Sequence, residues 1–128
     1  MLTKDKWGPA AWHFLHAVAF KFPNNPTAEE RRWAKIFFNS VGHVLPCEPC
    51  NVHYQQYLRQ NPVQTETRER LSNWLIDLHN KVNEKNNKPA WQYEKVYDHY
   101  HNNPNSSFKV VVVGIIIVTI IGLVLLYA

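Results

Sequence analysis

The apolar residues of the first hundred positions recur every three or four residues, which is the period of an α-helix. Five segments show this period, and the last of them is short and aromatic: 9–22, 28–45, 48–60, from Thr65 or Thr67 to Asn86, and 91–100. No long segment alternates apolar and polar residues as a half-buried strand does. The pattern therefore predicts an all-α fold, a four-helix bundle with a short fifth helix.

Proline and capping residues set the predicted helix boundaries. Pro9 suits the first position of a helix, and the Pro- and Asn-rich stretch 23–26 ends that helix. Thr27 and Glu30 have the spacing of a capping box at the start of the second helix. Pro46 breaks the second helix.

The apolar positions also predict which helix faces turn toward the core. In the second helix the predicted stripe consists of Trp33, Ile36, Phe37, Val41 and Val44. In the fourth helix it consists of Leu71, Trp74, Leu75, Leu78 and Val82.

A different pattern begins near residue 109. Residues 110–128 are uncharged and rich in Val, Ile and Leu, and as a helix they would span roughly 28 Å, close to the thickness of a bilayer core. Lys109 and Tyr127 flank them as interfacial anchors would. We therefore expect a helical domain at 1–100, a polar linker at 101–108 and a transmembrane tail anchor at 109–128.

Charge and the N-terminal stretch narrow the class of protein. The chain has 14 Lys and Arg and 10 Asp and Glu, a net charge of +4 that is too small and too dispersed to indicate nucleic-acid binding. Residues 1–7 are polar and lack the apolar core of a signal peptide. With an anchor at the other end, we expect the helical domain to face the cytosol.

The two cysteines of the chain, Cys47 and Cys50, form a C-x-x-C pair at the predicted start of the third helix. Two cysteines this close cannot join distant elements, so they indicate a redox pair or part of a metal site. A helix N-terminus favours the thiolate form, which is the form that attacks disulfides. A thioredoxin-like site would need strands, and haem attachment would need His where the chain has Asn51.

Three groups of residues, taken in order, resemble the Erv/ALR family of flavin-linked sulfhydryl oxidases. The first is W-G-x-x-x-W-x-x-L-H at 7–16, the second is C-x-x-C-x-x-H at 47–53, and the third is H-N-x-V-N at 79–83. The resemblance covers about residues 4–100 and is nearest to the small versions of large cytoplasmic DNA viruses.

The resemblance implies a helical fold that holds FAD at the mouth of the bundle. It implies that Cys50 lies against the flavin and forms a charge-transfer thiolate, and that Cys47 exchanges disulfides with substrate. The family's cofactor-binding positions correspond to Trp7, Gly8, Trp12, His16, His53, Trp74, His79, Asn80, Val82, Asn83, Lys85 and Lys88, with Trp91 or Tyr97 at the adenine.

The resemblance further implies that thiol substrates are oxidised to disulfides and that oxygen is reduced to hydrogen peroxide. Many members of the family carry an additional shuttle pair of cysteines, which this chain lacks. A small thioredoxin-like or CxC-type relay protein is therefore the expected partner of Cys47. A homodimer is a further expectation, with Trp33 and Phe38 as its surface, and a viral or host membrane, or the virion, is the expected location.

Two other functions stay open on the residues alone. One is a membrane-anchored structural zinc module that uses Cys47, Cys50, His53 and one further His. The other is a membrane-tethered interaction domain without catalysis, whose cysteine pair is incidental.

Overall fold

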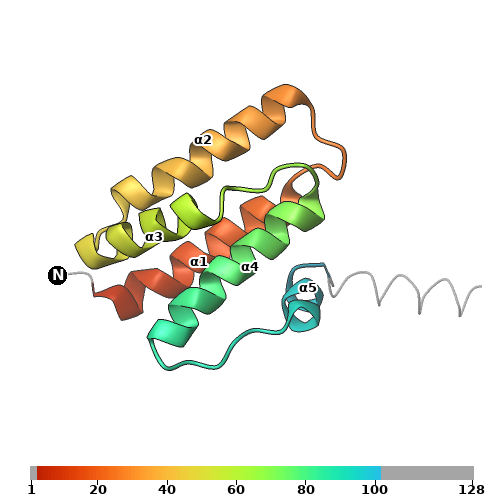
Figure 1. The fold of residues 1–128 in the computed structure, drawn as a ribbon. Coiled ribbons are helices and arrows are strands. Elements are labelled where there is room, and N and C mark those ends of the chain that lie inside the picture. The colour runs from red at the N-terminus through yellow and green to blue at the C-terminus, as the bar shows by residue number, and fades with distance from the viewer. Residues whose placement is uncertain (1–2, 102–128) are drawn as a thin grey trace, which may run out of the picture.

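The computed structural model describes residues 3–101, and these residues form five helices without a strand (Figure 1). The helices are α1 (Lys4–Lys21), α2 (Ala28–Val44), α3 (Glu48–Gln60), α4 (Arg68–Lys85) and α5 (Tyr93–His101). The four longer helices run up and down in turn, and α5 lies beside the end of α1. The all-α prediction, with four main helices and a short fifth, is confirmed.

The bundle is built from two helix pairs. α1 packs against α4, α2 packs against α3, and α5 packs on α1 and α4. The main core lies between the two pairs and buries apolar side chains from all four helices, among them Leu15, Ala19, Phe38, Val41, Tyr54, Leu71, Trp74, Leu75 and Leu78. A second, smaller core under α5 consists of Phe20, Ile76 and Val96. Burial of these apolar surfaces is the main force that holds short helices in place.

α2 and α3 approach each other closely at Gly42. A Cβ atom at this position would lie 2.6 Å from Cδ1 of Tyr54 and 3.3 Å from Cγ of Gln55. The Tyr54 hydroxyl donates a hydrogen bond to the Phe38 carbonyl at 2.8 Å, which joins the same two helices one turn further on. The absent side chain of Gly42 thus makes room for the Tyr54 ring.

Predicted caps agree with the structure in the middle of the chain. The Thr27 side chain accepts from the Glu30 N–H while Glu30 accepts from the Thr27 N–H, so the capping box is confirmed. Thr67, one of the two predicted candidates, caps α4 by accepting from the Arg70 N–H. α3 has the predicted bounds.

The predicted start of the first helix was wrong. α1 begins at Lys4, and Pro9 lies inside it rather than at its first position. The Thr3 carbonyl accepts hydrogen bonds from the N–H groups of Lys6 and Trp7, at 2.9 and 3.2 Å, and these bonds start the helix earlier. The apolar pattern could not show this extra turn because residues 4–6 are charged and exposed.

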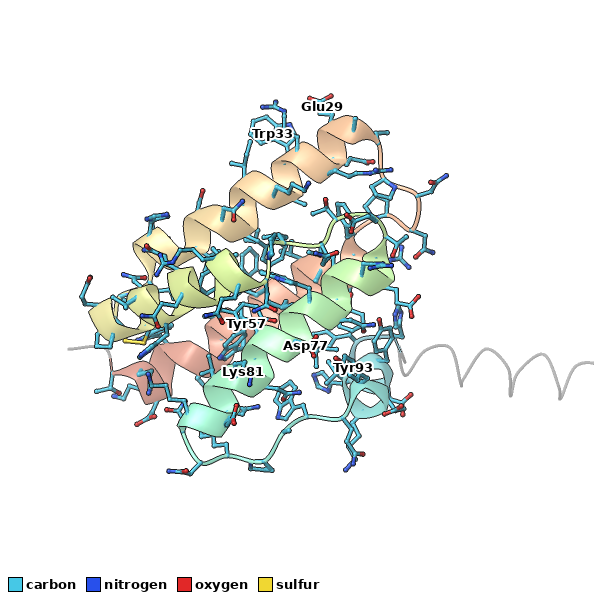
Figure 2. All side chains as sticks on the ribbon, viewed as in Figure 1. Glu29, Trp33, Tyr57, Asp77, Lys81 and Tyr93 are labelled. Carbon is cyan, nitrogen blue, oxygen red and sulfur yellow. A yellow bond between two sulfur atoms is a disulfide. The ribbon has the colours of Figure 1, made fainter. Side chains whose placement is uncertain are left out.

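The predicted core stripe of the second helix was also partly wrong. Phe38 and Val41 are buried, but Trp33, Ile36 and Val44 are exposed. Trp33 stands on the outer face of α2, where its indole N–H donates to Glu29 (Figure 2). α2 carries apolar residues on two faces, and spacing alone does not decide which face meets α3. Because Phe38 is fully buried, it cannot form the expected dimer surface.

The predicted membrane tail at 109–128 lies outside the described residues. So does the predicted linker, except for its first residue, His101, which belongs to α5. Within residues 3–101, no helix has the length and the apolar character that crossing a bilayer requires.

Candidate active site

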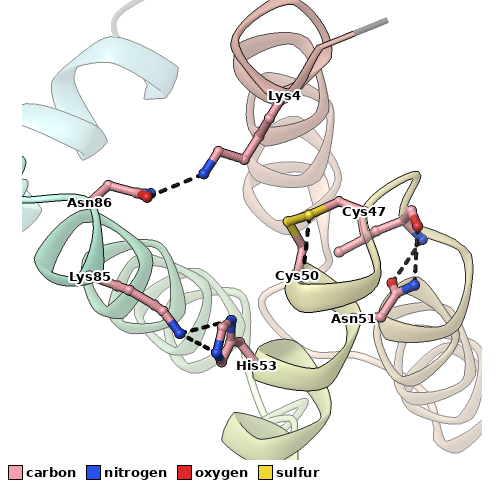
Figure 3. Close-up of a disulfide and its surroundings, with 8 residues drawn as sticks. Lys4, Cys47, Cys50, Asn51, His53, Lys85 and Asn86 are labelled. Atoms are coloured by element: carbon pink, nitrogen blue, oxygen red, sulfur yellow. Dashed lines mark hydrogen bonds between the residues drawn. A yellow bond between two sulfur atoms is a disulfide. The ribbon is translucent and has the colours of Figure 1, made fainter. Parts of the chain in front are cut away.

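Cys47 and Cys50 form a disulfide at the N-terminus of α3 (Figure 3). Cys47 is the N-cap residue, and its sulfur accepts a hydrogen bond from the Cys50 N–H at 3.3 Å. Pro49 lies in the first turn, where a missing N–H costs no helical hydrogen bond. Both sulfurs therefore lie in the positive field of a helix N-terminus, which stabilises a thiolate when the disulfide opens.

The disulfide forms part of the wall of a cavity with a volume of about 710 Å³. That volume falls within the roughly 300–1,000 Å³ typical of small-molecule and cofactor sites. The wall is built from the first half of α1, the end of α2, the face of α3 and the last half of α4. Eight of the predicted site residues line it: Trp7, Gly8, Trp12, Cys47, Cys50, His53, Val82 and Lys85.

The charged residues on the cavity wall are cationic. Lys4, Arg59, Lys81 and Lys85 line it, and no acidic residue does among those that the structure describes. The amine of Lys4 donates to Asn86 at 3.3 Å across the gap between α1 and α4, and the Lys85 amine contacts the His53 ring (Figure 3). Such a wall is suited to an anionic ligand with an extended aromatic part.

Behind this wall, aromatic rings from α1, α4 and the loop before α5 are stacked. The rings of Trp12 and His79 lie parallel, with centroids 3.9 Å apart. His16 and His79 share a hydrogen bond of 3.0 Å, and the Trp91 ring lies 4.4 Å from that of His79. The predicted residues His16, His79 and Trp91 thus lie behind Trp12 and do not themselves line the cavity.

Burial keeps both histidines neutral. It lowers the pKa of His16 to about 4, assisted by nearby His13 and His99, and it lowers the pKa of His79 to about 3, assisted by His16 and Lys88. Neutral rings allow one N–H to donate to the other ring, as the short His16–His79 contact requires.

This pair predicts a loss of stability in acid. The unfolded chain takes up protons on both histidines below a pH of about 6.5, whereas the folded chain does not, so stability is complete above that pH and falls as the pH decreases toward 4. We expect the free energy of unfolding in urea to fall by about 2–4 kcal/mol between pH 7 and 5. His79→Gln should remove about half of the difference, and His43→Gln, at an exposed position, should leave it unchanged. Equal pH dependence in all three proteins would contradict the assignment.

Two further predicted residues, Asn80 and Asn83, have different surroundings. The Asn80 side chain bonds both backbone groups of Trp91, at 2.7 and 3.0 Å, and so holds the loop before α5. Asn83 is buried, and its amide nitrogen has no hydrogen-bond partner; the same holds for Nδ1 of His16. Unpaired buried polar groups are costly, and a bound ligand is one way to satisfy them.

A family model described as Erv1 / Alr matches residues 9–101. The chain belongs to the Erv1/Alr family. It is 38% identical over 100 residues to the probable FAD-linked sulfhydryl oxidase R368 of Acanthamoeba polyphaga mimivirus. The matched region covers 76% of this chain and 70% of the relative. It is 39% identical over 87 residues to the mitochondrial FAD-linked sulfhydryl oxidase ERV1 of Saccharomyces cerevisiae. That match covers 68% of this chain and 46% of the relative.

Solved structures agree with this membership. The FAD-binding domain of Erv1 from Saccharomyces cerevisiae superposes with a TM-score of 0.76 at 33% identity, covering 78% of this chain and 95% of that chain. The FAD-linked sulfhydryl oxidase ERV1 of Oryza sativa subsp. japonica is 37% identical over 95 residues, 74% of this chain and 49% of the relative. The chain thus spans about half the length of its rice and yeast relatives.

Like His16, His79, Asn80, Asn83 and Trp91, three further predicted site residues of this Erv1/Alr member do not line the main cavity. Trp74 is in the main core, and its indole N–H donates to the Asn61 carbonyl at 2.9 Å. Tyr97 packs on Phe20 and donates to Asn73 at 2.9 Å. Lys88 borders a second hollow of about 590 Å³ that also includes Asn80. A cofactor contact at these residues stays a prediction.

Asn51, which directly follows the second cysteine, was not among the predicted site residues. Its side chain bonds both backbone groups of Leu45, each at 3.1 Å, and so holds the turn that leads into Cys47. An Asn beside a C-x-x-C pair was the available signal, but Leu45, which it bonds, lies six residues earlier, in the turn between α2 and α3.

Proposed function

We propose that this chain is a FAD-linked sulfhydryl oxidase, which oxidises thiols to disulfides at Cys47 and Cys50 and passes the electrons to oxygen, giving hydrogen peroxide. The observation that carries the proposal is the position of the disulfide. It lies on the wall of an aromatic, cationic cavity, so a ligand in that cavity would be next to the two sulfurs. The relatives described above are FAD-linked sulfhydryl oxidases, which supports the same cofactor and reaction.

The residues present fit FAD. Trp7 and Trp12 offer ring faces for a planar ring system. Lys4 and Lys85 offer positive charge for a pyrophosphate. The unpaired amide of Asn83 offers a donor for the polar edge of a ring.

The chain's own sulfurs perform the exchange with substrate. A substrate thiolate attacks the sulfur of Cys47, the bond between Cys47 and Cys50 breaks, and Cys50 leaves as a thiolate within the first turn of α3. A second substrate thiolate attacks the substrate sulfur, which releases the oxidised substrate and leaves Cys47 as a thiolate at the N-cap. The reduced pair then holds two more electrons than the disulfide. Bound FAD would supply the two-electron acceptor that oxygen reoxidises.

The zinc module and the interaction domain receive less support. Both sulfurs are joined in the disulfide, so neither is available as the thiolate that zinc requires. Among residues 3–101, no three His, Cys, Asp or Glu side chains are placed to hold a metal ion. A cysteine pair without a chemical function is not expected to lie beside a cavity of cofactor size.

The partners follow from the same site. Since the sequence contains two cysteines, both in this pair, we propose that a substrate or a small thioredoxin-like or CxC-type relay protein reaches Cys47 directly. A homodimer would use exposed apolar residues of α1 and α2, of which Phe14 and Trp33 are 59% and 54% exposed. Sedimentation of the purified protein would test the dimer.

We also propose that residues 109–128 anchor the protein in a membrane, with the helical domain on the cytosolic side. The described chain ends at His101, whose ring lies 5.1 Å from that of Phe20 near the end of α1, whereas the disulfide cavity includes Trp7 near its start. The two sites are therefore roughly 20 Å apart along α1. We expect the disulfide of the anchored protein to face away from the bilayer. Flotation with lipid vesicles would test the anchor.

An absorption spectrum of the full chain, purified in detergent, tests the proposed function. We expect the bands of oxidised flavin to persist after desalting, and dithiothreitol to bleach them without oxygen and to restore them once oxygen is admitted. Oxygen consumption should then accompany thiol oxidation. A folded but colourless protein that does not regain flavin from added FAD would contradict the proposal.

A further inference from the structure

The turn that presents Cys47 is held by hydrogen bonds from a single side chain. The Leu45 N–H donates to Oδ1 of Asn51, and Nδ2 of Asn51 donates to the Leu45 carbonyl, each at 3.1 Å (Figure 3). A side-chain amide that pairs with both groups of one residue fixes its position and its orientation. Asn51 therefore joins α3 to the end of α2 on the far side of the turn.

A second set of bonds continues from Leu45 to the cysteine. The Cys47 N–H donates to the Leu45 carbonyl at 2.7 Å, which closes a tight turn around Pro46, and the Asn51 N–H donates to the Cys47 carbonyl at 3.0 Å. Pro46 restricts the backbone of that turn further. Cys47 is thus tied to Asn51 on one side by backbone and on the other side through Leu45.

We propose that Asn51 is a positioning residue for disulfide exchange, which keeps Cys47 next to Cys50 while Cys47 carries the sulfur of another molecule. The proposal rests on the proposed exchange at Cys47. In the resting state the disulfide itself holds the two sulfurs together. Once the Cys47 sulfur has joined a substrate sulfur, that covalent restraint is gone, and the bonds from Asn51 through Leu45 hold the turn.

The consequence is a high effective concentration of Cys50 toward the mixed disulfide. The Cys50 thiolate attacks the Cys47 sulfur, the bond from Cys47 to the foreign sulfur breaks, and the foreign thiol leaves. One disulfide is exchanged for another, so no external oxidant enters this step. A loose turn would make the step less favourable and leave more mixed disulfide at equilibrium.

Gln55 provides a matched control one helical turn along α3. Its amide donates to the Gly42 carbonyl at 2.9 Å, so it also joins α3 to the end of α2, but it does not bond the turn at 45–47. Asn51→Leu and Gln55→Met each replace an amide by an apolar side chain of similar size. Both should lower stability, and only the first should affect the exchange.

The test uses glutathione as the foreign thiol and the full chain without oxygen. The protein is equilibrated with a fixed mixture of reduced and oxidised glutathione and quenched with acid, and mass spectrometry gives the ratio of Cys47 mixed disulfide to Cys47–Cys50 disulfide. We expect Asn51→Leu to raise this ratio about three- to tenfold, and Gln55→Met to leave it within about twofold of the parent. Asn51→Asp keeps the acceptor for the Leu45 N–H and loses the donor to the Leu45 carbonyl, so it should give an intermediate ratio.

The outcomes separate this inference from the proposed oxidase. Equal ratios in the parent, Asn51→Leu and Asn51→Asp would overturn the positioning role, and so would an equal rise in Gln55→Met. If Asn51→Leu does not fold, Asn51→Asp alone decides. The exchange step itself requires neither flavin nor oxygen, so the difference between variants can hold or fail whether or not the chain shows oxidase activity.

Discussion

Replacing Cys47 with serine is expected to lower thiol-oxidase turnover by at least about 10³-fold and to leave the cofactor bound. A serine oxygen cannot form the disulfide that a substrate thiolate attacks. Cys47 caps α3 through a weak sulfur contact, and serine is a preferred N-cap residue, so the helix should be retained. The loss would therefore be chemical rather than structural.

The same change at Cys50 distinguishes the roles of the two sulfurs. Both variants should lose turnover, measured as oxygen consumption with dithiothreitol. Cys47→Ser keeps the Cys50 thiolate beside the cavity and should show the long-wavelength absorbance of a thiolate in contact with flavin, whereas Cys50→Ser should not. Ser40→Ala, at an exposed position of α2, serves as the control for effects of substitution and purification that do not involve the cysteines. Retained oxidation in both cysteine variants would show that the electrons follow another route.

The helices could be predicted from sequence where each has one apolar face and clear ends. α3 is the best case, since Pro46 precedes it and Asn61 with Pro62 follows it. α1 shows the limit, because its first turn is charged and depends on the Thr3 carbonyl, which leaves no apolar signal.

The face of a helix is harder to predict than its presence. Trp33 and Phe38 both belong to the apolar residues of α2, but one is 54% exposed and the other is fully buried. Only the packing partner decides between them, and a spacing rule contains no information about that partner.

The residues of the candidate site differ in the same way. Those that belong to one short segment could be predicted from sequence, whereas those that depend on contacts between helices could not. The cysteine pair is recognised from four consecutive residues, and Trp7 and Trp12 belong to a motif that lies within α1. The hydrogen bond between His16 and His79 joins residues 63 positions apart, and Asn51 bonds Leu45 in the turn between α2 and α3. Such contacts depend on the tertiary fold. The sequence therefore predicts which residue types belong to the site, but not which of them are hydrogen-bonded to each other.

Gly42→Ala is expected to lower the free energy of unfolding by about 1–3 kcal/mol, which corresponds to a fall in melting temperature of about 5–20 °C for a domain of this size. Alanine is the better helix former, so an unhindered site would gain stability. Here the added Cβ would lie 2.6 Å from the Tyr54 ring, and that ring is buried and fixed by the bond from its hydroxyl to the Phe38 carbonyl. The ring must shift, and α2 and α3 must separate.

Gly8 offers the matched control, since it is also a buried glycine inside a helix. The nearest atom to its added Cβ is Cγ of Lys4 at 4.0 Å, an ordinary contact with a flexible side chain. Gly8→Ala should therefore be neutral or raise the stability by up to about 1 kcal/mol. Thermal and urea unfolding of the cofactor-free protein measure both changes. If Gly42→Ala unfolds with the same midpoint as the parent, α2 and α3 are not packed as closely as the structure has them.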